Sequence, residues 1–152
     1  MNKKGPIIII EDDMDDQLLF QTCFSELEYS NELMFFTDGE TALNFLNGEG
    51  EKLIPFLIIS DINMPKLDGF ALRDKIKLDA KLQIRCIPYL FFTSALTQDN
   101  VIAAYEKSIQ GFFLKPNSLD ELKKIITLIM GYWKYCASPN NFIKYNVQKN
   151  AV

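Results

Sequence analysis

Five short apolar runs alternate along the chain with longer segments whose apolar residues recur at helical spacing. The runs are rich in β-branched and aromatic side chains and lie at Ile7–Ile10, Leu33–Thr37, Phe56–Ile59, Ile87–Phe92 and Gly111–Leu114. They are apolar throughout rather than at every second position, which is typical of parallel strands covered on both faces. We therefore expect five buried strands.

A helix is expected after each strand. Helical spacing starts at Met14 and at Asp38-Gly39, returns in Phe70, Leu72 and Ile76, and covers about Gln98–Lys107. A capping-box sequence, Ser118 to Glu121, opens the last helix, which should turn Leu122, Ile125, Ile126, Ile129 and Trp133 inward. The acidic segment Asn47–Glu51 is interpreted as a rather long loop.

Five β-α units in succession predict an α/β fold, a doubly wound five-stranded parallel sheet of the flavodoxin-like (βα)5 type. One common form of this fold has the strand order 2-1-3-4-5, which we adopt. The composition does not change before Gly131. We therefore expect one domain over residues 5–131, with a helix extension and a polar tail over residues 132–152.

Four of the five strands are followed, at the point where each leaves the core, by polar residues suited to binding a metal or a phosphoryl group. Glu11 and Asp12 follow the first strand, Asp61 the third, Thr93 the fourth and Lys115 the fifth. In folds of this type, ligands bind outside the carboxyl ends of the strands. With the first and third strands as neighbours, three carboxylates should crowd together at this edge. Asp61 could there be a nucleophile or a metal ligand, whereas its plain interpretation is a loop residue that caps the next turn.

Other polar residues near the strand ends have simpler explanations. Thr37 and Asp38, after the second strand, are interpreted as capping residues. Asp13, Asp15 and Asp16 fit the first turn of a helix, where the helix dipole favours negative charge.

Crowded carboxylates repel one another unless a cation lies among them. A hard divalent ion, Mg²⁺ or Mn²⁺, would resolve that conflict, with Glu11, Asp12, Asp61 and the backbone carbonyl of Asn63 as ligands. Asp61 could then attack a phosphoryl group, while Lys115 supplies a positive charge and Thr93 a hydroxyl donor. The strand ends thus point to phosphoryl chemistry.

Composition excludes several other functions. The chain has no histidine, so histidine-dependent catalytic triads, histidine-ligated zinc and a phosphohistidine on this chain are ruled out. The net charge of −4, without a cluster of lysine and arginine, does not support nucleic-acid binding. No apolar run reaches the length of a membrane span or a signal peptide. Three cysteines without CxxC spacing fit a reducing compartment, and we expect a cytoplasmic protein.

These motifs resemble the response-regulator receiver domain of two-component signalling, a CheY-like family. The resemblance runs from about Pro6 to Met130 and rests on IIIIEDD, DINMPKLDG, FFTSA and GFFLKP. It implies a phosphoryl acceptor at Asp61, an acidic metal pair at Glu11 and Asp12, a carbonyl ligand at Asn63, and phosphoryl-sensing groups at Thr93 and Lys115. It also implies a switching aromatic at Phe112 and a cis Lys115–Pro116 bond.

The same resemblance implies partners and a mode of action. The donor would be a sensor histidine kinase or a histidine phosphotransfer protein, and the phosphorylated chain would change its affinity for an unidentified downstream protein. Chemistry would be limited to self-phosphorylation and self-dephosphorylation, so we do not class the protein as an enzyme. The segment after Met130 is too short for a DNA-binding output domain, and an interaction or homodimer surface is one interpretation of Tyr132 and Trp133.

Three alternatives remain, two with this architecture and one with similar chemistry. A pseudo-receiver would be a binding module that never carries phosphate. A magnesium-dependent phosphohydrolase would use an aspartyl nucleophile, but its motif has a second aspartate two residues later, where this chain has Asn63. A flavin mononucleotide binder is disfavoured because the acids after the first strand would repel a phosphate without a metal.

Overall fold

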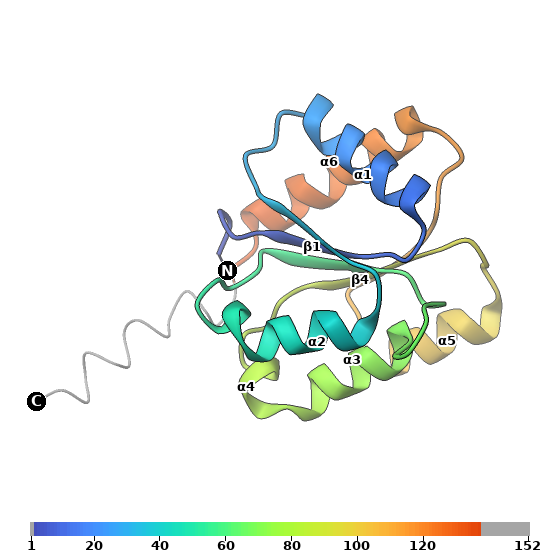
Figure 1. Cartoon of the computed structure of the whole chain (residues 1–152). Helices are drawn as coiled ribbons and strands as arrows, with labels where there is room; N and C mark the ends of the chain where they lie inside the picture. The colour runs from blue at the N-terminus through green and yellow to red at the C-terminus, as the bar shows by residue number, and fades with distance from the viewer. Residues whose placement is uncertain (1, 138–152) are drawn as a thin grey trace, which may run out of the picture.

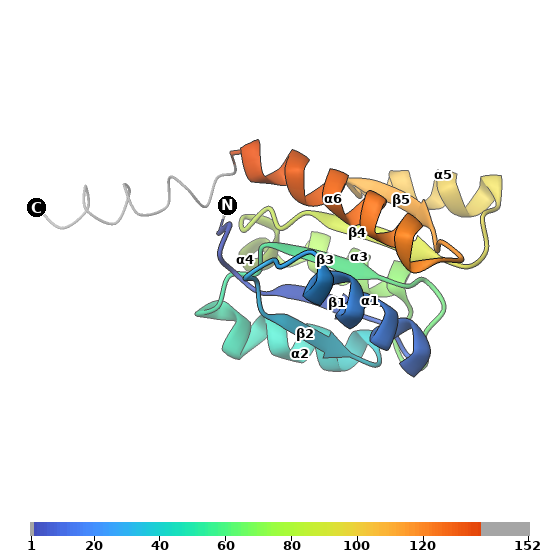
Figure 2. The same ribbon diagram turned by 90° about the horizontal axis from the view of Figure 1, so that it is seen from above.

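The computed structural model describes residues 2–137, apart from the side chain of residue 51, so the polar tail from residue 138 onward lies outside the described residues (Figure 1). Its five strands are β1 (Ile7–Ile10), β2 (Leu33–Phe36), β3 (Leu57–Ser60), β4 (Tyr89–Thr93) and β5 (Gly111–Leu114). They form one parallel sheet in the order β2-β1-β3-β4-β5, as Figure 2 shows from above. The predicted fold class and strand order are confirmed.

The helices form a layer on each side of this sheet. They are α1 (Met14–Glu26), α2 (Gly39–Asn47), α3 (Gly69–Leu78), α4 (Ala80–Gln83), α5 (Gln98–Glu106) and α6 (Leu119–Tyr135), with a 3-10 turn, η1, at Glu49–Glu51. Helices α1 and α6 cover one face, and α2 to α5 lie on the other (Figure 1). None of the helices within residues 2–137 is long and apolar enough to cross a membrane.

The alternation of side chains along each strand explains why the strands are apolar throughout. In β1, Ile7 and Ile9 pack into the core under α1 and α6, whereas Ile8 and Ile10 pack into the core on the opposite face. All four are essentially without solvent exposure. A polar residue at any of these positions would lose hydration in one core or the other, so the sequence shows no period of two.

The structure differs from the sequence expectations in several places, among them β2, which ends at Phe36 rather than Thr37, and β3, which covers Leu57–Ser60 rather than Phe56–Ile59. The short elements α4 and η1 were not expected, because segments of three or four residues show no helical period. Strand β4 begins at Tyr89 rather than Ile87, since the intervening Pro88 has no backbone N–H to donate to a strand neighbour. The expected cis Lys115–Pro116 bond is wrong: this bond is trans, the form that X–Pro bonds favour in folded proteins.

Helix α6 places its apolar residues largely as expected. Leu122, Ile126 and Ile129 are buried against the α1 side of the sheet together with Met130, which was not foreseen, while Ile125 and Trp133 pack at the edge of this core. Tyr132 points outward and is two-thirds exposed. The expected helix extension is therefore present as far as Tyr135.

Helix α3 is tied to the far end of α5. The Arg73 guanidinium donates to the carbonyl oxygens of Lys107 and Ser108, at 3.1 and 2.8 Å, and the Lys77 ammonium donates to the Glu106 carbonyl at 3.3 Å. Lys107 also binds Asp74 at 2.6 Å. Cations of one helix thus cap the unpaired carbonyls that end the other.

Candidate functional site

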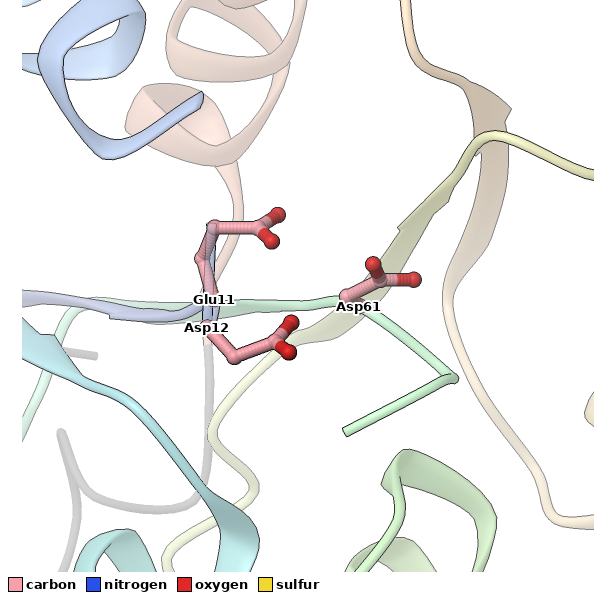
Figure 3. Close-up of side chains that lie close together, drawn as sticks. All are labelled: Glu11, Asp12 and Asp61. Atoms are coloured by element: carbon pink, nitrogen blue, oxygen red, sulfur yellow. The ribbon is translucent and has the colours of Figure 1, made fainter. Parts of the chain in front are cut away.

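Two neighbouring strands bring the acidic residues together. Ile10 and Ser60 are paired in the ladder between β1 and β3, so the next residues, Glu11 and Asp61, leave the sheet side by side. The Asp61 backbone N–H still donates to the Ile10 carbonyl at 2.9 Å. Carboxylate oxygens of Glu11, Asp12 and Asp61 all lie within 4.8 Å of one another, and Figure 3 shows the three side chains projecting into the same space.

A lysine that follows β5, the outermost strand on the β4 side of the sheet, reaches these acids. Lys115 directly follows β5, and its Nζ lies 2.7 Å from Glu11 Oε2, 2.9 Å from Asp61 Oδ2 and 2.7 Å from Asp16 Oδ2. The Lys115 backbone N–H donates to the Thr93 carbonyl at 2.9 Å, which fixes the start of this side chain beside the end of β4. The ammonium is thus held at the carboxyl edge of the sheet.

The surroundings of Glu11 and Lys115 raise the pKa of both groups. Glu11 is only 2% exposed, and loss of hydration raises the pKa of its carboxyl to about 7, although Lys115 works in the opposite direction. Burial disfavours the charged form of Lys115 as well, but the hydrogen bonds to Asp16, Glu11 and Asp61 outweigh it and raise the pKa of this ammonium. A charged lysine therefore lies beside the buried Glu11 carboxyl, whose ionisation burial disfavours.

The Asp61 carboxylate is fixed in orientation. Its Oδ1 accepts a hydrogen bond from the Ile62 backbone N–H at 2.6 Å, while Oδ2 accepts from Lys115. Two contacts hold the loop that follows. The Ile62 carbonyl accepts from the Gly69 N–H at 2.9 Å, which joins the two ends of the loop, and Lys66, inside the loop, forms an ion pair with Asp38 at 3.1 Å. Two donors, one to each oxygen, thus hold the buried Asp61 carboxylate in one orientation.

The remaining expected residues lie around this edge. Asn63 is exposed in the loop two residues after Asp61. Thr93 is fully buried at the end of β4, and its Oγ1 accepts from the Ala95 N–H at 3.4 Å. Phe112 is half-buried in β5, and its ring lies edge-on to that of Phe91, with 6.3 Å between the centroids.

Sequence reasoning missed the contact of Asp16. We assigned this residue to the first helical turn as a charge on the dipole, and Asp13 does cap α1 by accepting from the N–H groups of Asp15 and Asp16. Asp16 itself, however, reaches across to Lys115. Asp16 lies in the first turn of α1 like Asp15, and the sequence contains no signal that Lys115 lies opposite.

The donor set fits a hard divalent cation. Its three groups offer only oxygen, two of them are buried, and their oxygens are close enough to share one ion. A divalent ion would also favour the charged form of Glu11, which burial disfavours. Glu11, Asp12 and Asp61 could therefore hold Mg²⁺ or Mn²⁺.

Comparison with known proteins agrees with this geometry. A family model for the response regulator receiver domain matches residues 7–127. The chain belongs to the response regulator receiver family. The expected resemblance is thereby confirmed over nearly all of the described domain.

Two curated relatives are similar to this chain over most of their length. The response regulator Rcp1 of Synechocystis sp. is 32% identical over 135 residues, covering 87% of this chain and 90% of Rcp1. The probable methanogenesis regulatory protein FilR2 of Methanothrix harundinacea is 28% identical over 129 residues, covering 84% of this chain and 82% of FilR2.

Solved receiver structures share the architecture. The Mn²⁺-bound form of Rcp1 superposes with a TM-score of 0.74 at 31% identity, covering 88% of this chain and 97% of Rcp1. The phosphorylated cyanobacterial phytochrome response regulator RcpA gives a TM-score of 0.75 at 28% identity, covering 88% of this chain and 96% of RcpA. A relative is thus known in a metal-bound form and another in a phosphorylated form.

Proposed function

We propose that this receiver accepts a phosphoryl group on Asp61 from a histidine kinase or a histidine phosphotransfer protein, with Mg²⁺ as cofactor. The observation that carries the proposal is the position of the Asp61 carboxylate, fixed by the Ile62 N–H and by Lys115 beside the acidic pair Glu11 and Asp12. Phosphorylation then changes the affinity of the protein for a downstream partner.

The transfer step is a displacement at phosphorus. A carboxylate oxygen of Asp61 forms a bond to the phosphorus of a phosphohistidine while the P–N bond breaks, and the imidazole leaves with the electron pair. Lys115 compensates negative charge on the phosphoryl oxygens, and the Thr93 hydroxyl donates to one of them. Water later hydrolyses the acyl phosphate and restores the carboxylate.

The metal would be held by Glu11, Asp12 and Asp61, with the Asn63 carbonyl as a further ligand. A bound divalent cation supplies positive charge to the phosphoryl oxygens during transfer. The chain's own contribution is to keep three carboxylates at close range and to hold the Asp61 carboxylate in one orientation. Lys115 alone could not balance these three carboxylates and an incoming phosphoryl group.

The signal is proposed to pass through Thr93 and Phe112. Movement of the Thr93 hydroxyl toward the phosphoryl group would vacate space near β5, and the half-buried Phe112 could turn into it. A phenylalanine has no hydroxyl, so its exposed position gains no hydrogen bond. Phe112→Ala should leave phosphorylation intact but reduce the ratio of partner affinities between the two states, and an unchanged ratio would exclude this role.

Intact mass after incubation with acetyl phosphate and Mg²⁺ tests the central proposal. We expect a mass gain of one phosphoryl group that requires Mg²⁺ and is absent in Asp61→Asn. Asp99→Asn is a matched control, because Asp99 is exposed in the first turn of α5 and is not one of the three clustered carboxylates. A gain in Asp61→Asn would contradict the assignment of the acceptor.

A missing mass gain would have two explanations that beryllium fluoride separates. Binding of beryllium fluoride with Mg²⁺ would indicate a receiver that refuses small donors, whereas failure to bind would favour a pseudo-receiver. Steady release of phosphate from a phosphomonoester would instead favour a phosphohydrolase. Within residues 2–137, no contact favours either alternative over the receiver.

Self-association is part of the proposal. Leu128, Tyr132 and Tyr135 are among the most exposed large apolar residues of the described chain and recur at spacings of four and three along α6, as in helices that pair in coiled coils. We infer that a second copy covers this strip. Sedimentation should show a dimer that Leu128→Glu disrupts and that Thr127→Glu, at the exposed neighbouring position, leaves intact.

The cellular setting is a proposal as well. All three cysteines, Cys23, Cys86 and Cys136, are free thiols, which is typical of a reducing compartment such as the cytoplasm.

A further inference from the structure

The Lys115 ammonium is divided among three acids. Its three N–H groups face three carboxylate oxygens, of Asp16, Glu11 and Asp61, at 2.7 to 2.9 Å. An ammonium has three donors, and here it makes hydrogen bonds to Asp16 and Asp61 and a close ion pair with Glu11. Lys115 can therefore bind a phosphoryl oxygen only if one of these contacts is weakened or shared.

Asp16 differs from the other two acids in position and in engagement. Glu11 and Asp61 leave the ends of strands and belong to the carboxylate group that could hold a metal, whereas Asp16 lies on α1 and is not part of that group. Among the described residues, the Asp16 carboxylate is bound by Lys115. Its side chain is one-third exposed, so it can be rehydrated when the lysine leaves.

We propose that Asp16 is a positioning residue that holds Lys115 in the unphosphorylated protein and competes with the phosphoryl group for its ammonium. The inference rests on the proposed function, because it assumes that Lys115 serves a phosphoryl group on Asp61. In the phosphorylated state, Glu11 would bind the metal and Asp61 would carry the phosphoryl group. The strength of the contact between Asp16 and Lys115 therefore decides how readily the lysine can bind the phosphoryl group. The carboxylate thereby lowers the affinity of the site for a phosphoryl group.

The competition has a predictable sign. Replacing Asp16 with asparagine keeps the size and the ability to accept a hydrogen bond but removes the charge that attracts the ammonium. Lys115 then gives up a weaker electrostatic attraction when it turns toward a phosphoryl oxygen. The unphosphorylated state becomes less favourable relative to the phosphorylated one.

Beryllium fluoride, a phosphoryl mimic, tests this without any transfer step. With saturating Mg²⁺, calorimetric titration of Asp16→Asn should show about tenfold tighter binding than the original protein, equivalent to about 1.4 kcal/mol. Asp15→Asn is the matched control, because Asp15 is exposed in the same helical turn and carries the same charge. It should change the affinity by less than about twofold, and Asp16→Glu should stay close to the original affinity.

A second background separates a contact with Lys115 from a general effect of charge. In Lys115→Gln, the additional Asp16→Asn change should have almost no effect, since the competition requires the ammonium. Unchanged or weaker binding in Asp16→Asn, or the same tenfold gain in the Lys115→Gln background, would overturn the inference. Lack of binding by the original protein would instead reject the proposed function, and the inference with it.

Discussion

Gly69 packs directly against the backbone of Asp61. A Cβ atom at position 69 would overlap the Asp61 carbonyl oxygen, and it would also lie 2.8 Å from the ring of Phe91 and 3.0 Å from the Ile62 Cα. The start of α3 therefore lies against the residue that bears the candidate phosphoryl acceptor. Only a residue without a side chain allows this approach while the Gly69 N–H keeps its bond to the Ile62 carbonyl.

Gly69→Ala should accordingly displace the loop after Asp61. Because the obstructing atoms are backbone and a packed ring, we expect a loss of about 1–3 kcal/mol in the free energy of unfolding. Phosphorylation by acetyl phosphate should also slow, since the Asp61 carboxylate shifts from its donors. Urea unfolding and the rate of mass gain measure the two effects.

Gly131→Ala is the matched control for this change. Gly131 lies inside α6, and a Cβ there would meet no atom within 4 Å. Alanine should raise the free energy of unfolding by about 0.5–1 kcal/mol, because it favours the helix more than glycine does. Equal effects of the two substitutions would refute the role assigned to Gly69.

Asp38 should contribute to stability in a pH-dependent way. Its carboxylate caps α2 by accepting from the Thr41 N–H at 2.9 Å and also binds Lys66, and these bonds lower its pKa, with the Thr41 contact as the main cause. A lowered pKa means that the stabilisation is present above the unfolded value of about 3.9 and is lost as the pH falls through the folded value below it.

Asp38→Asn should be less stable than the original protein by about 1–2 kcal/mol at neutral pH. The difference should shrink as the pH falls below about 4, where the native carboxylate becomes protonated. Chemical denaturation over a pH series measures it, with the exposed Asp99→Asn as control. A difference that persists at the lowest pH would mean that charge is not the cause.

The cysteines should differ widely in reactivity. Cys23 is buried in α1, and burial raises the pKa of its thiol to about 11, so roughly one molecule in a thousand carries the thiolate at pH 8. Cys86 is exposed. Brief treatment with iodoacetamide, followed by peptide mass mapping, should label Cys86 long before Cys23. Labelling of both at similar rates would contradict the packing described for α1.

Arg73 should stabilise the protein beyond its charge. Its guanidinium binds two carbonyls beyond α5 and lies 5.4 Å from the centroid of the buried Tyr89 ring. Arg73→Ala should lower the free energy of unfolding by about 2–3 kcal/mol, through hydrogen bonds from a charged donor and the cation–π contact. Lys75→Ala, at an exposed position of the same helix, should change it by less than about 0.5 kcal/mol. Comparable losses would refute this role.

The strands and the location of the site could be predicted from the sequence for physical reasons. Both faces of the sheet are covered, so each strand appears as an unbroken apolar run, and Glu11 and Asp61 follow two of these runs directly. Parallel strands end at one edge, so residues after them meet regardless of their distance along the chain. This is why residues 50 positions apart could be assigned to one site.

Other features depend on three-dimensional distances that a sequence pattern does not contain. Asp16 looks like any acid in a first helical turn until the position of Lys115 is known. Gly69 carries no sign of its contact with the Asp61 carbonyl. Helix α4 has four residues, which is fewer than a helical pattern requires.

The contacts from α3 restrain α5 at its last turn. Arg73 and Lys77 hold the carbonyls at residues 106–108. The first residue of α5, Gln98, lies about 12 Å away along the helix axis and close in sequence to Thr93. If Thr93 moves on phosphorylation, as proposed above, we expect the first turn of α5 to shift more than its last turn, which α3 restrains. Backbone amides in the first turn of α5 should therefore exchange with solvent faster than those in its last turn.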